Sequence, residues 1–271
     1  MSVKRIRPSQ WITILFGLLL IYSGFIEPYW VRVREIEISD EPFASFFRAH
    51  KTIFLSDIHV TKSGIRENFL LEKVTQLSAE IILLGGDLVA WNGNYQAAFE
   101  FLGKLKAPGG VYGVLGESDF QDNRKSCNFC HPFDKSLTPF SAKFLQNKAV
   151  YHSPNEPAIF GVDFGSLEPE LKHRSGLSTI KEPAIILCHK LAACNEIPDV
   201  SVLMLSGDTH GGQFWMPDWF WVWVFGESKG SIRKGIRRSG NKTFLVTSGI
   251  GTSHFPFRFL CPPEVVLLKG K

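Results

Sequence analysis

The stretch Thr52-Ile-Phe-Leu-Ser-Asp-Ile-His59 runs from an apolar segment directly into two side chains that can bind a metal ion. Its first four residues form a short apolar run of the kind found in buried β-strands. Residues i and i+2 of an extended chain point to the same side, so Asp57 and His59 can reach one ion. The stretch therefore predicts a strand that delivers part of a metal site at its carboxyl end.

Four later apolar runs end in the same kind of residue. The runs and their endings are 81–84 with Asp87, 111–115 with Glu117, Ser118 and Asp119, 184–187 with His189, and 202–205 with Asp208 and His210. Any single ending of this kind is more often a plain turn or a core histidine. In open α/β sheets, however, ligands bind beyond the carboxyl ends of the strands, so the ordered set predicts one shared site.

Helical patterns alternate with the first of these runs, over residues 66–78 and 95–105. The resulting β-α-β-α-β order predicts an α/β fold. Residues 31–38 alternate apolar and charged side chains, as a half-exposed strand does. Further strands are expected at 244–247 and 265–268, and this strand-rich second half predicts a second sheet packed on the first.

The amino-terminal segment Trp11–Ile26 carries no charged residue and is expected to be a membrane helix. Sixteen helical residues span about 24 Å, and Tyr29 and Trp30 can extend the span into the far interface. We therefore expect residues 1–30 to be a single-pass anchor and residues 31–271 to be the catalytic domain. A cleaved signal peptide and a buried helix are the alternatives, although no small-x-small cleavage site follows the segment.

The charges around this segment predict its orientation. Lys4, Arg5 and Arg7 precede it, whereas Arg32 and Arg34 follow it. Basic residues favour the cytoplasmic side, so the domain is expected on the outer side of the membrane.

Composition excludes several other classes of protein. Of the 271 residues, 44% are hydrophobic and 21% are charged, as in ordinary globular chains. The net charge of +4 comes without a long basic run, so nucleic acid is not an expected partner. Five cysteines are too few for a disulfide scaffold of this length, and their odd number leaves at least one unpaired within a monomer.

The strand endings resemble, in order and spacing, the motifs of the calcineurin-like metallophosphoesterase family, which are D-x-H, G-D, G-N-H-[DE], a lone His and G-H-x-H. The resemblance runs from about Thr52 to the end of the chain. Gly-Gly-Gln after His210, and the ending that contains Arg258 and Glu264, are similar to bacterial YaeI-type phosphodiesterases, which are membrane-linked or exported. The resemblance implies a four-layer α/β/β/α sandwich of two mixed β-sheets after the membrane helix.

The resemblance also implies two divalent metal ions and their ligands. The first metal would be held by Asp57, His59, Asp87 and His210, and the second by the bridging Asp87 with Glu117, His189 and Asp208. Glu117 replaces the usual Asn and Asp208 the usual His, so the second site is more anionic than usual in the family. Harder ligands favour Mn²⁺, Fe or Mg²⁺ over soft-ligand metals; Mn²⁺ is the first choice, and Zn²⁺ stays open.

A third departure concerns the residue that contacts phosphate. Ser118 stands where the family has a His that can protonate the leaving oxygen, and Ser118 and Asp119 are the candidate catalytic residues. A serine hydroxyl has no pKa near 7 with which to replace this general acid. We therefore expect two-metal hydrolysis of a phosphodiester or pyrophosphate bond with a good leaving group. The rival hypothesis is a metal-binding pseudoenzyme that serves as a binding module.

Aromatic residues crowd the segment Phe214–Phe225, and basic residues follow it. This pattern suits a membrane–water interface, but it also fits a core strand followed by an exposed basic hairpin. With the anchor, it predicts the membrane as a partner and a phosphorylated, lipid-linked small-molecule substrate. Among relatives, UDP-2,3-diacylglucosamine hydrolases also act on a lipid substrate, on the cytoplasmic side, and are an alternative.

The segment Cys127-Asn128-Phe129-Cys130-His131 matches the spelling of c-type haem attachment. A disulfide, half of a metal clip and an ordinary loop are the alternatives. The other histidines stand in no motif and are expected to be structural; they are His50, His152, His173 and His254.

Overall fold

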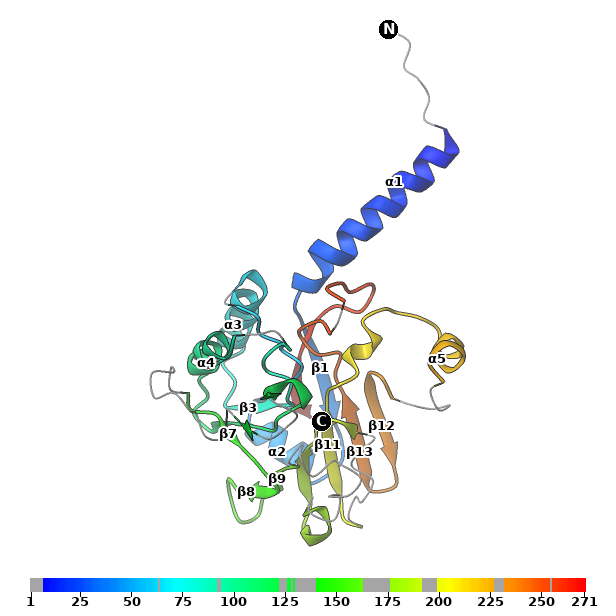
Figure 1. The fold of residues 1–271 in the computed structure, drawn as a ribbon. Coiled ribbons are helices and arrows are strands. Elements are labelled where there is room, and N and C mark those ends of the chain that lie inside the picture. Colours follow the sequence, from blue (N-terminus) through cyan, green and yellow to red (C-terminus); the bar gives the residue numbers. More distant parts are fainter. Residues whose placement is uncertain are drawn as a thin grey trace.

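The computed structural model describes residues 7–62, 64–91, 94–121, 126–127, 129, 140–162, 176–191, 199–226, 232–253 and 255–271. Two six-stranded sheets pack face to face, and a long helix projects from the domain (Figure 1). Both sheets are mixed, as predicted.

The first sheet has the strand order β1-β14-β2-β3-β4-β7. Its strands are β1 (Arg32–Ile38), β2 (Thr52–Leu55), β3 (Ile81–Leu84), β4 (Gly110–Gly113), β7 (Lys143–Phe144) and β14 (Glu264–Gly270). β14 runs antiparallel to β2, and the other neighbours are parallel. β1 pairs with β14, so the two ends of the domain are joined in one sheet.

The second sheet has the order β12-β13-β11-β10-β9-β8. Its strands are β8 (Lys148–Val150), β9 (Ala158–Gly161), β10 (Ala184–Leu187), β11 (Val202–Ser206), β12 (Gly235–Ser239) and β13 (Lys242–Val246). The two edge strands are antiparallel and the four inner strands are parallel. A separate hairpin consists of β5 (Phe120–Gln121) and β6 (Ser126–Cys127).

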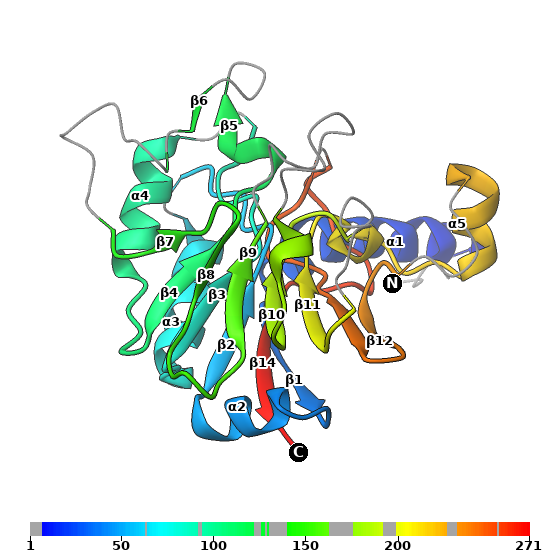
Figure 2. The same cartoon turned by 90° about the horizontal axis from the view of Figure 1, so that it is seen from below.

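Alternating side chains divide the interior into layers. Ile53 and Ile82 face α3 (Ile65–Leu77) and α4 (Tyr95–Lys104), which cover the first sheet. Phe54 and Leu83 face the other way and pack in the core between the two sheets, which lie side by side in Figure 2. The outer face of the second sheet is covered, within the described residues, by the turn η6 (Leu177–Thr179) and neighbouring segments.

The predicted α/β fold is confirmed, and the ten expected strands and helices occur within about two residues of their expected bounds. The sequence reasoning missed α2 (Phe43–Ala49), which packs against β14, and the strands β5, β6, β7, β8 and β9. Each of these strands is short or half polar, so its periodicity is weak.

The alternative of a core strand within Phe214–Phe225 is wrong. Residues Asp218–Phe225 form a helix, α5. This eight-residue run lies outside both sheets and pairs with none of their strands. Trp219 and Trp223 are 67% and 79% exposed, while Trp221 is buried. The basic hairpin expected after this segment is present as β12 and β13, with Arg237 and Arg238 exposed on β12.

The helix α1 (Pro8–Ile21) continues through the helical turns η1 (Tyr22–Ile26) and η2 (Glu27–Tyr29). By length and composition, Pro8–Tyr29 is the one segment of the described chain suited to crossing a membrane. Its apolar side chains, such as Phe16 and Leu18, are exposed, and the helix points away from the domain (Figure 1).

The foot of this helix is fastened to the domain by a buried carboxylate. Glu27 is fully buried and accepts hydrogen bonds from the backbone N–H groups of Leu260 and Cys261, at 2.8 and 2.6 Å. The Ser23 carbonyl accepts another from the backbone N–H of Arg258. The junction between the helix and the domain is therefore a packed contact.

Replacing Glu27 with Ala is expected to lower the free energy of unfolding by about 2–4 kcal/mol, because two buried N–H groups lose their acceptors. Urea unfolding of the full-length protein in detergent measures this. Glu37→Ala, at an exposed position of β1, is the matched control and should change stability little. Equal stability of the two variants would contradict the role assigned to Glu27.

Candidate metal centre

The predicted metal ligands lie where strands end and the backbone turns sharply. Five of them have left-handed backbone conformations, with φ of 51° at Asp57, 47° at His59, 53° at Asp87, 70° at Asp208 and 50° at His210. Such conformations cost about 1–3 kcal/mol each for residues with a side chain and cluster at functional sites. The chain is thus bent, at a cost in stability, at the positions where the ligands must converge.

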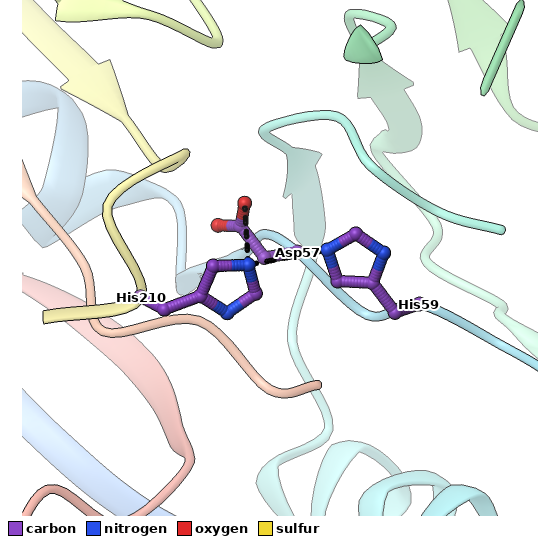
Figure 3. Close-up of side chains that lie close together, drawn as sticks. All are labelled: Asp57, His59 and His210. Atoms are coloured by element: carbon purple, nitrogen blue, oxygen red, sulfur yellow. Dashed lines mark hydrogen bonds and ion pairs between the residues drawn. The ribbon is translucent and has the colours of Figure 1, made fainter. Parts of the chain in front are cut away.

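One group of three ligands consists of Asp57, His59 and His210, all buried (Figure 3). The Nε2 atoms of the two histidines are 3.2 Å apart, and their rings are stacked. Asp57 Oδ1 lies 3.8 Å from His210 Nε2. Residues 151 positions apart in sequence therefore meet within the reach of one ion.

A second group consists of Asp57, Asp87 and His189. Asp87 also reaches the first group. Its Oδ2 atom is 3.4 Å from His59 Nε2, and its Oδ1 atom is 3.5 Å from His189 Nε2. Asp57 belongs to both groups. The two carboxylates therefore stand at the centre, with imidazoles on either side, as a two-ion site requires.

Backbone hydrogen bonds hold these side chains in place. Asp57 Oδ1 accepts from the N–H of Asp208, and Asp87 Oδ1 accepts from the N–H of Ser118, both at 2.9 Å. His189 Nδ1 lies 2.8 Å from the Gly85 carbonyl, which turns Nε2 towards the carboxylates. A partner on the far nitrogen is the usual way in which a metal-binding histidine is oriented.

Glycines make room for the two central carboxylates. A Cβ atom at position 207 would lie 2.2 Å from Asp57 Oδ2, and one at position 116 would lie 2.2 Å from Asp87 Oδ1. Neither position tolerates a side chain unless a ligand moves. Close packing against the two carboxylates, as well as the turn, therefore explains why positions 116 and 207 are glycines.

In the protein without bound ions, burial and neighbouring charges shift the pKa values of the central side chains in opposite directions. Burial, together with the charge of Asp87, raises the pKa of Asp57 to about 7. Burial lowers the pKa of His59 to about 4, and it opposes the charged form of His189. The carboxylate of Asp87 nevertheless raises the pKa of His189 to about 10, and His189 in turn keeps the pKa of Asp87 well below its usual value.

This donor set fits divalent cations. It combines buried carboxylates and imidazoles, which suit Mn²⁺, Fe and Zn²⁺. Asp57 Oδ2 is buried and has no hydrogen-bond partner among the described residues. A buried carboxylate oxygen in this state is costly in the protein alone and is satisfied when it coordinates a cation.

Glu117 and Asp208, the two replacements, lie at the edge of the centre and share a cation. Lys190 Nζ is 2.7 Å from Glu117 Oε2 and 3.7 Å from Asp208 Oδ1. Although burial opposes it, the Glu117 carboxylate raises the pKa of Lys190 and keeps it charged. Asp208 Oδ1 also lies 3.7 Å from His189 Nε2, but neither Asp208 nor Glu117 belongs to the three-ligand groups of the described residues.

The sequence reasoning did not single out Lys190. A lysine beside a histidine carries no motif, and its partner Glu117 is 73 positions away. The charge of the pocket could have predicted it. Two acidic replacements, Glu117 and Asp208, in one buried pocket are stable only with a neighbouring cation.

The two candidate catalytic residues differ in their surroundings. The Asp119 carboxylate accepts hydrogen bonds from the backbone N–H groups of Leu88, Val89 and Gly116, so it ties together the loops that carry Asp87 and Glu117. Burial raises its pKa to about 7. Ser118 Oγ is buried, and no hydrogen-bond partner for it is found in the described part of the chain.

Of the other described histidines and cysteines, His50 and His152 lie near each other away from the metal centre, whereas Cys188 precedes His189 and Cys261 Sγ contacts the backbone of His210 and Gly211. His50 bridges Glu80 and Glu156 at 2.9 Å each, and its ring is 5.6 Å from that of His152. Outside the described residues lie His173, His254, Cys130, His131 and the side chain of Cys127. Cys188 is disulfide-bonded, and Cys261 is a buried free thiol.

Comparison with known proteins finds relatives over most of the chain. The chain is 24% identical to the metallophosphoesterase YkuE of Bacillus subtilis, in an alignment covering 99% of each chain. It is 26% identical to a metallophosphoesterase of Aquifex aeolicus, covering 94% of this chain and 98% of the relative. These relatives confirm the resemblance to metallophosphoesterases.

The phosphodiesterase YaeI of Escherichia coli is 25% identical to the chain, with 92% of this chain and 91% of YaeI aligned. No protein-family model matches the chain. The alignment with YkuE, which covers 99% of this chain, includes the amino-terminal helix as well as the domain.

The metal-free protein is expected to lose stability as the pH rises from 7 to 9. The pKa of His189 is about 10 in the folded state, against an ordinary 6.5, so its proton stabilises the folded state fully below pH 6.5 and is lost towards pH 10. The free energy of unfolding should fall by up to about 1.4 kcal/mol per pH unit in this window. Urea unfolding at pH 7, 8 and 9 measures the slope.

His189→Gln removes this proton and should flatten the profile. Saturating Mn²⁺ should flatten it as well, because a coordinated imidazole is already neutral. A flat profile for the metal-free wild-type protein would contradict the charge assigned to His189.

Proposed function

We propose that this chain is a dinuclear metallophosphoesterase that hydrolyses a phosphodiester or pyrophosphate bond. The observation that carries the proposal is the shared pair of carboxylates, Asp57 and Asp87, with His59 and His210 on one side and His189 on the other. The relatives named metallophosphoesterase and phosphodiesterase support metal-dependent phosphoester hydrolysis.

The proposed ligand sets extend the two groups, and Asp87 is shared by both ions. Asp57, His59, Asp87 and His210 hold one divalent ion, and Asp87 and His189 hold the other together with Asp208 and Glu117. When bound, two such ions supply an activated water and neutralise the phosphoryl oxygens. Mn²⁺ is the ion that we propose first, with Fe, Mg²⁺ or Zn²⁺ as alternatives.

The residues of the chain around the centre perform the remaining tasks. Asp119 positions the loops of Asp87 and Glu117 through three backbone hydrogen bonds. Lys190 places a positive charge beside Asp208, where it can attract an anionic substrate. The Ser118 hydroxyl can donate a hydrogen bond to phosphate but is a poor proton source for a leaving alkoxide. These features favour substrates whose leaving group is already a weak base.

We further propose that the protein is anchored in a membrane, with residues 1–30 as the anchor and residues 31–271 as the catalytic domain. The exposed apolar helix α1 supports this, and so does α5, on the side towards which α1 leans (Figures 1 and 2). Trp221 of α5 packs against Gly212, two residues after His210, so an interfacial α5 would hold the metal centre close to the lipid. The substrate proposed here is accordingly phosphorylated and lipid-linked.

The disulfide at Cys188 supports placing the domain on the outer side of the membrane, because disulfides persist in oxidising compartments. This favours an extracytoplasmic phosphodiesterase over the alternative of a UDP-2,3-diacylglucosamine hydrolase, which would act in the reducing cytoplasm.

The Mn²⁺-loaded protein is expected to hydrolyse bis(p-nitrophenyl) phosphate, and Asp87→Ala is expected to be inactive. Without a general acid, rates should fall by about 10²–10⁴-fold from aryl to alkyl leaving groups. Release of p-nitrophenolate and of alcohol from matched diesters measures this. Metal binding without turnover would instead favour the pseudoenzyme, and a weak dependence on the leaving group would show that another acid replaces the family histidine.

A further inference from the structure

A cavity of about 720 Å³ opens beside the metal centre and reaches the foot of α1. His59, a ligand of the proposed first ion, lines one side, and Pro28 and Tyr29 of η2 line the other. The volume is within the range of about 300–1,000 Å³ that small-molecule sites occupy. The amino-terminal helix thus takes part in the wall of a cavity that the metal centre shares.

The walls of the cavity have a polar part and an apolar part. The polar part is contributed by Arg66, Glu67, Lys62, Thr61, Thr252 and Ser253, and the apolar part by Ile65, Ala90, Pro28 and Pro256. Ile65 is 66% exposed at the start of α3, which packs against η2. Phe25 and Ile26 of η1, which precede Pro28 in the chain, are exposed as well. An apolar path, continuous along the chain, therefore leads from the cavity-lining residues of η2 into the anchor.

Contacts between the anchor and the metal loops fix the direction of this path. Glu27 binds the backbone at 260–261, and the fully buried Arg258 donates hydrogen bonds to the carbonyls of Gly251 and Ser248. Gly251 packs directly on the carbonyl of Ile58 and the Cβ atom of His59. The turn η2 at the base of the helix and the ligand loops are consequently parts of one packed unit, which places the cavity beside the base of the helix.

We propose that this cavity binds the apolar, lipid part of a membrane lipid that carries a phosphodiester or pyrophosphate with a weakly basic leaving group, and that the scissile phosphoryl group lies at the metal centre. The inference rests on the proposed function and specifies its substrate class. In the reaction, water adds to phosphorus, the bond between phosphorus and the leaving oxygen breaks, and the lipid part stays in the cavity. The anchor is then a wall of the substrate site as well as a tether.

The test compares two substrates that release the same p-nitrophenolate, using full-length Mn²⁺-loaded protein in detergent. One is water-soluble bis(p-nitrophenyl) phosphate, and the other is dioleoylphosphatidyl-p-nitrophenol in mixed micelles. Ile65→Glu places a charge in the apolar part of the cavity at an exposed position in the first turn of α3, where an acid does not disfavour the helix. Ile65→Leu is the conservative variant, and Tyr151→Glu, exposed beside β8 at the other end of the domain, is the matched control.

The wild-type protein should prefer the lipid substrate in kcat/KM. Ile65→Glu should lower kcat/KM for the lipid by about tenfold or more, as disturbing an apolar pocket does, and should leave the soluble diester within about twofold. Ile65→Leu and Tyr151→Glu should resemble the wild type. An unchanged preference in Ile65→Glu, or turnover of the soluble diester alone by the wild type, would overturn the inference and leave the proposed function intact.

Binding gives a readout that does not depend on turnover. Dihexanoyl phosphatidate, which is soluble as a monomer, should bind the wild type in calorimetry and bind Ile65→Glu about tenfold more weakly. If neither substrate is hydrolysed, the proposed function fails, and this titration still decides on the cavity. Equal affinities of the wild type and Ile65→Glu would then overturn the inference.

Discussion

The structure depends on keeping two carboxylates, Asp57 and Asp87, buried beside each other among three imidazoles. Like charges at this depth repel each other and lose their hydration, which is why the pKa of Asp57 is raised to about 7. The backbone adds to this cost through its left-handed turns at the strand ends. A site of this kind is stable when cations occupy its centre, and the surrounding fold supplies the rigidity that holds it together until they bind.

That rigidity comes from loops that lock onto one another and onto the amino-terminal helix. Asp119 ties two ligand loops together through backbone hydrogen bonds, while Arg258, which is buried and has no carboxylate partner among the described residues, donates hydrogen bonds to three carbonyl groups of the carboxy-terminal loops. Glu27 extends this network into the foot of α1. The elements that position the metal ligands and the element proposed to cross the membrane therefore share one set of contacts.

Much of this organisation could be predicted from the sequence, because its signals are local. Apolar runs ending in Gly-Asp or Asp-x-His mark both the strands and the ligands, and the parallel arrangement brings their ends together. Other features depend on contacts that form only on folding. Phe214–Phe225 has no periodicity that separates helix from strand, and Lys190 and Asp119 take their roles from partners distant in the chain.

The central claim is that two ions share the bridging carboxylate of Asp87, with Asp57 beside it. Anomalous diffraction at the manganese edge, from crystals grown with Mn²⁺, tests it most directly. The account predicts two peaks about 3.5–4 Å apart, one against His59 and His210 and the other against His189. A single peak, or two peaks that do not share Asp87, would contradict it.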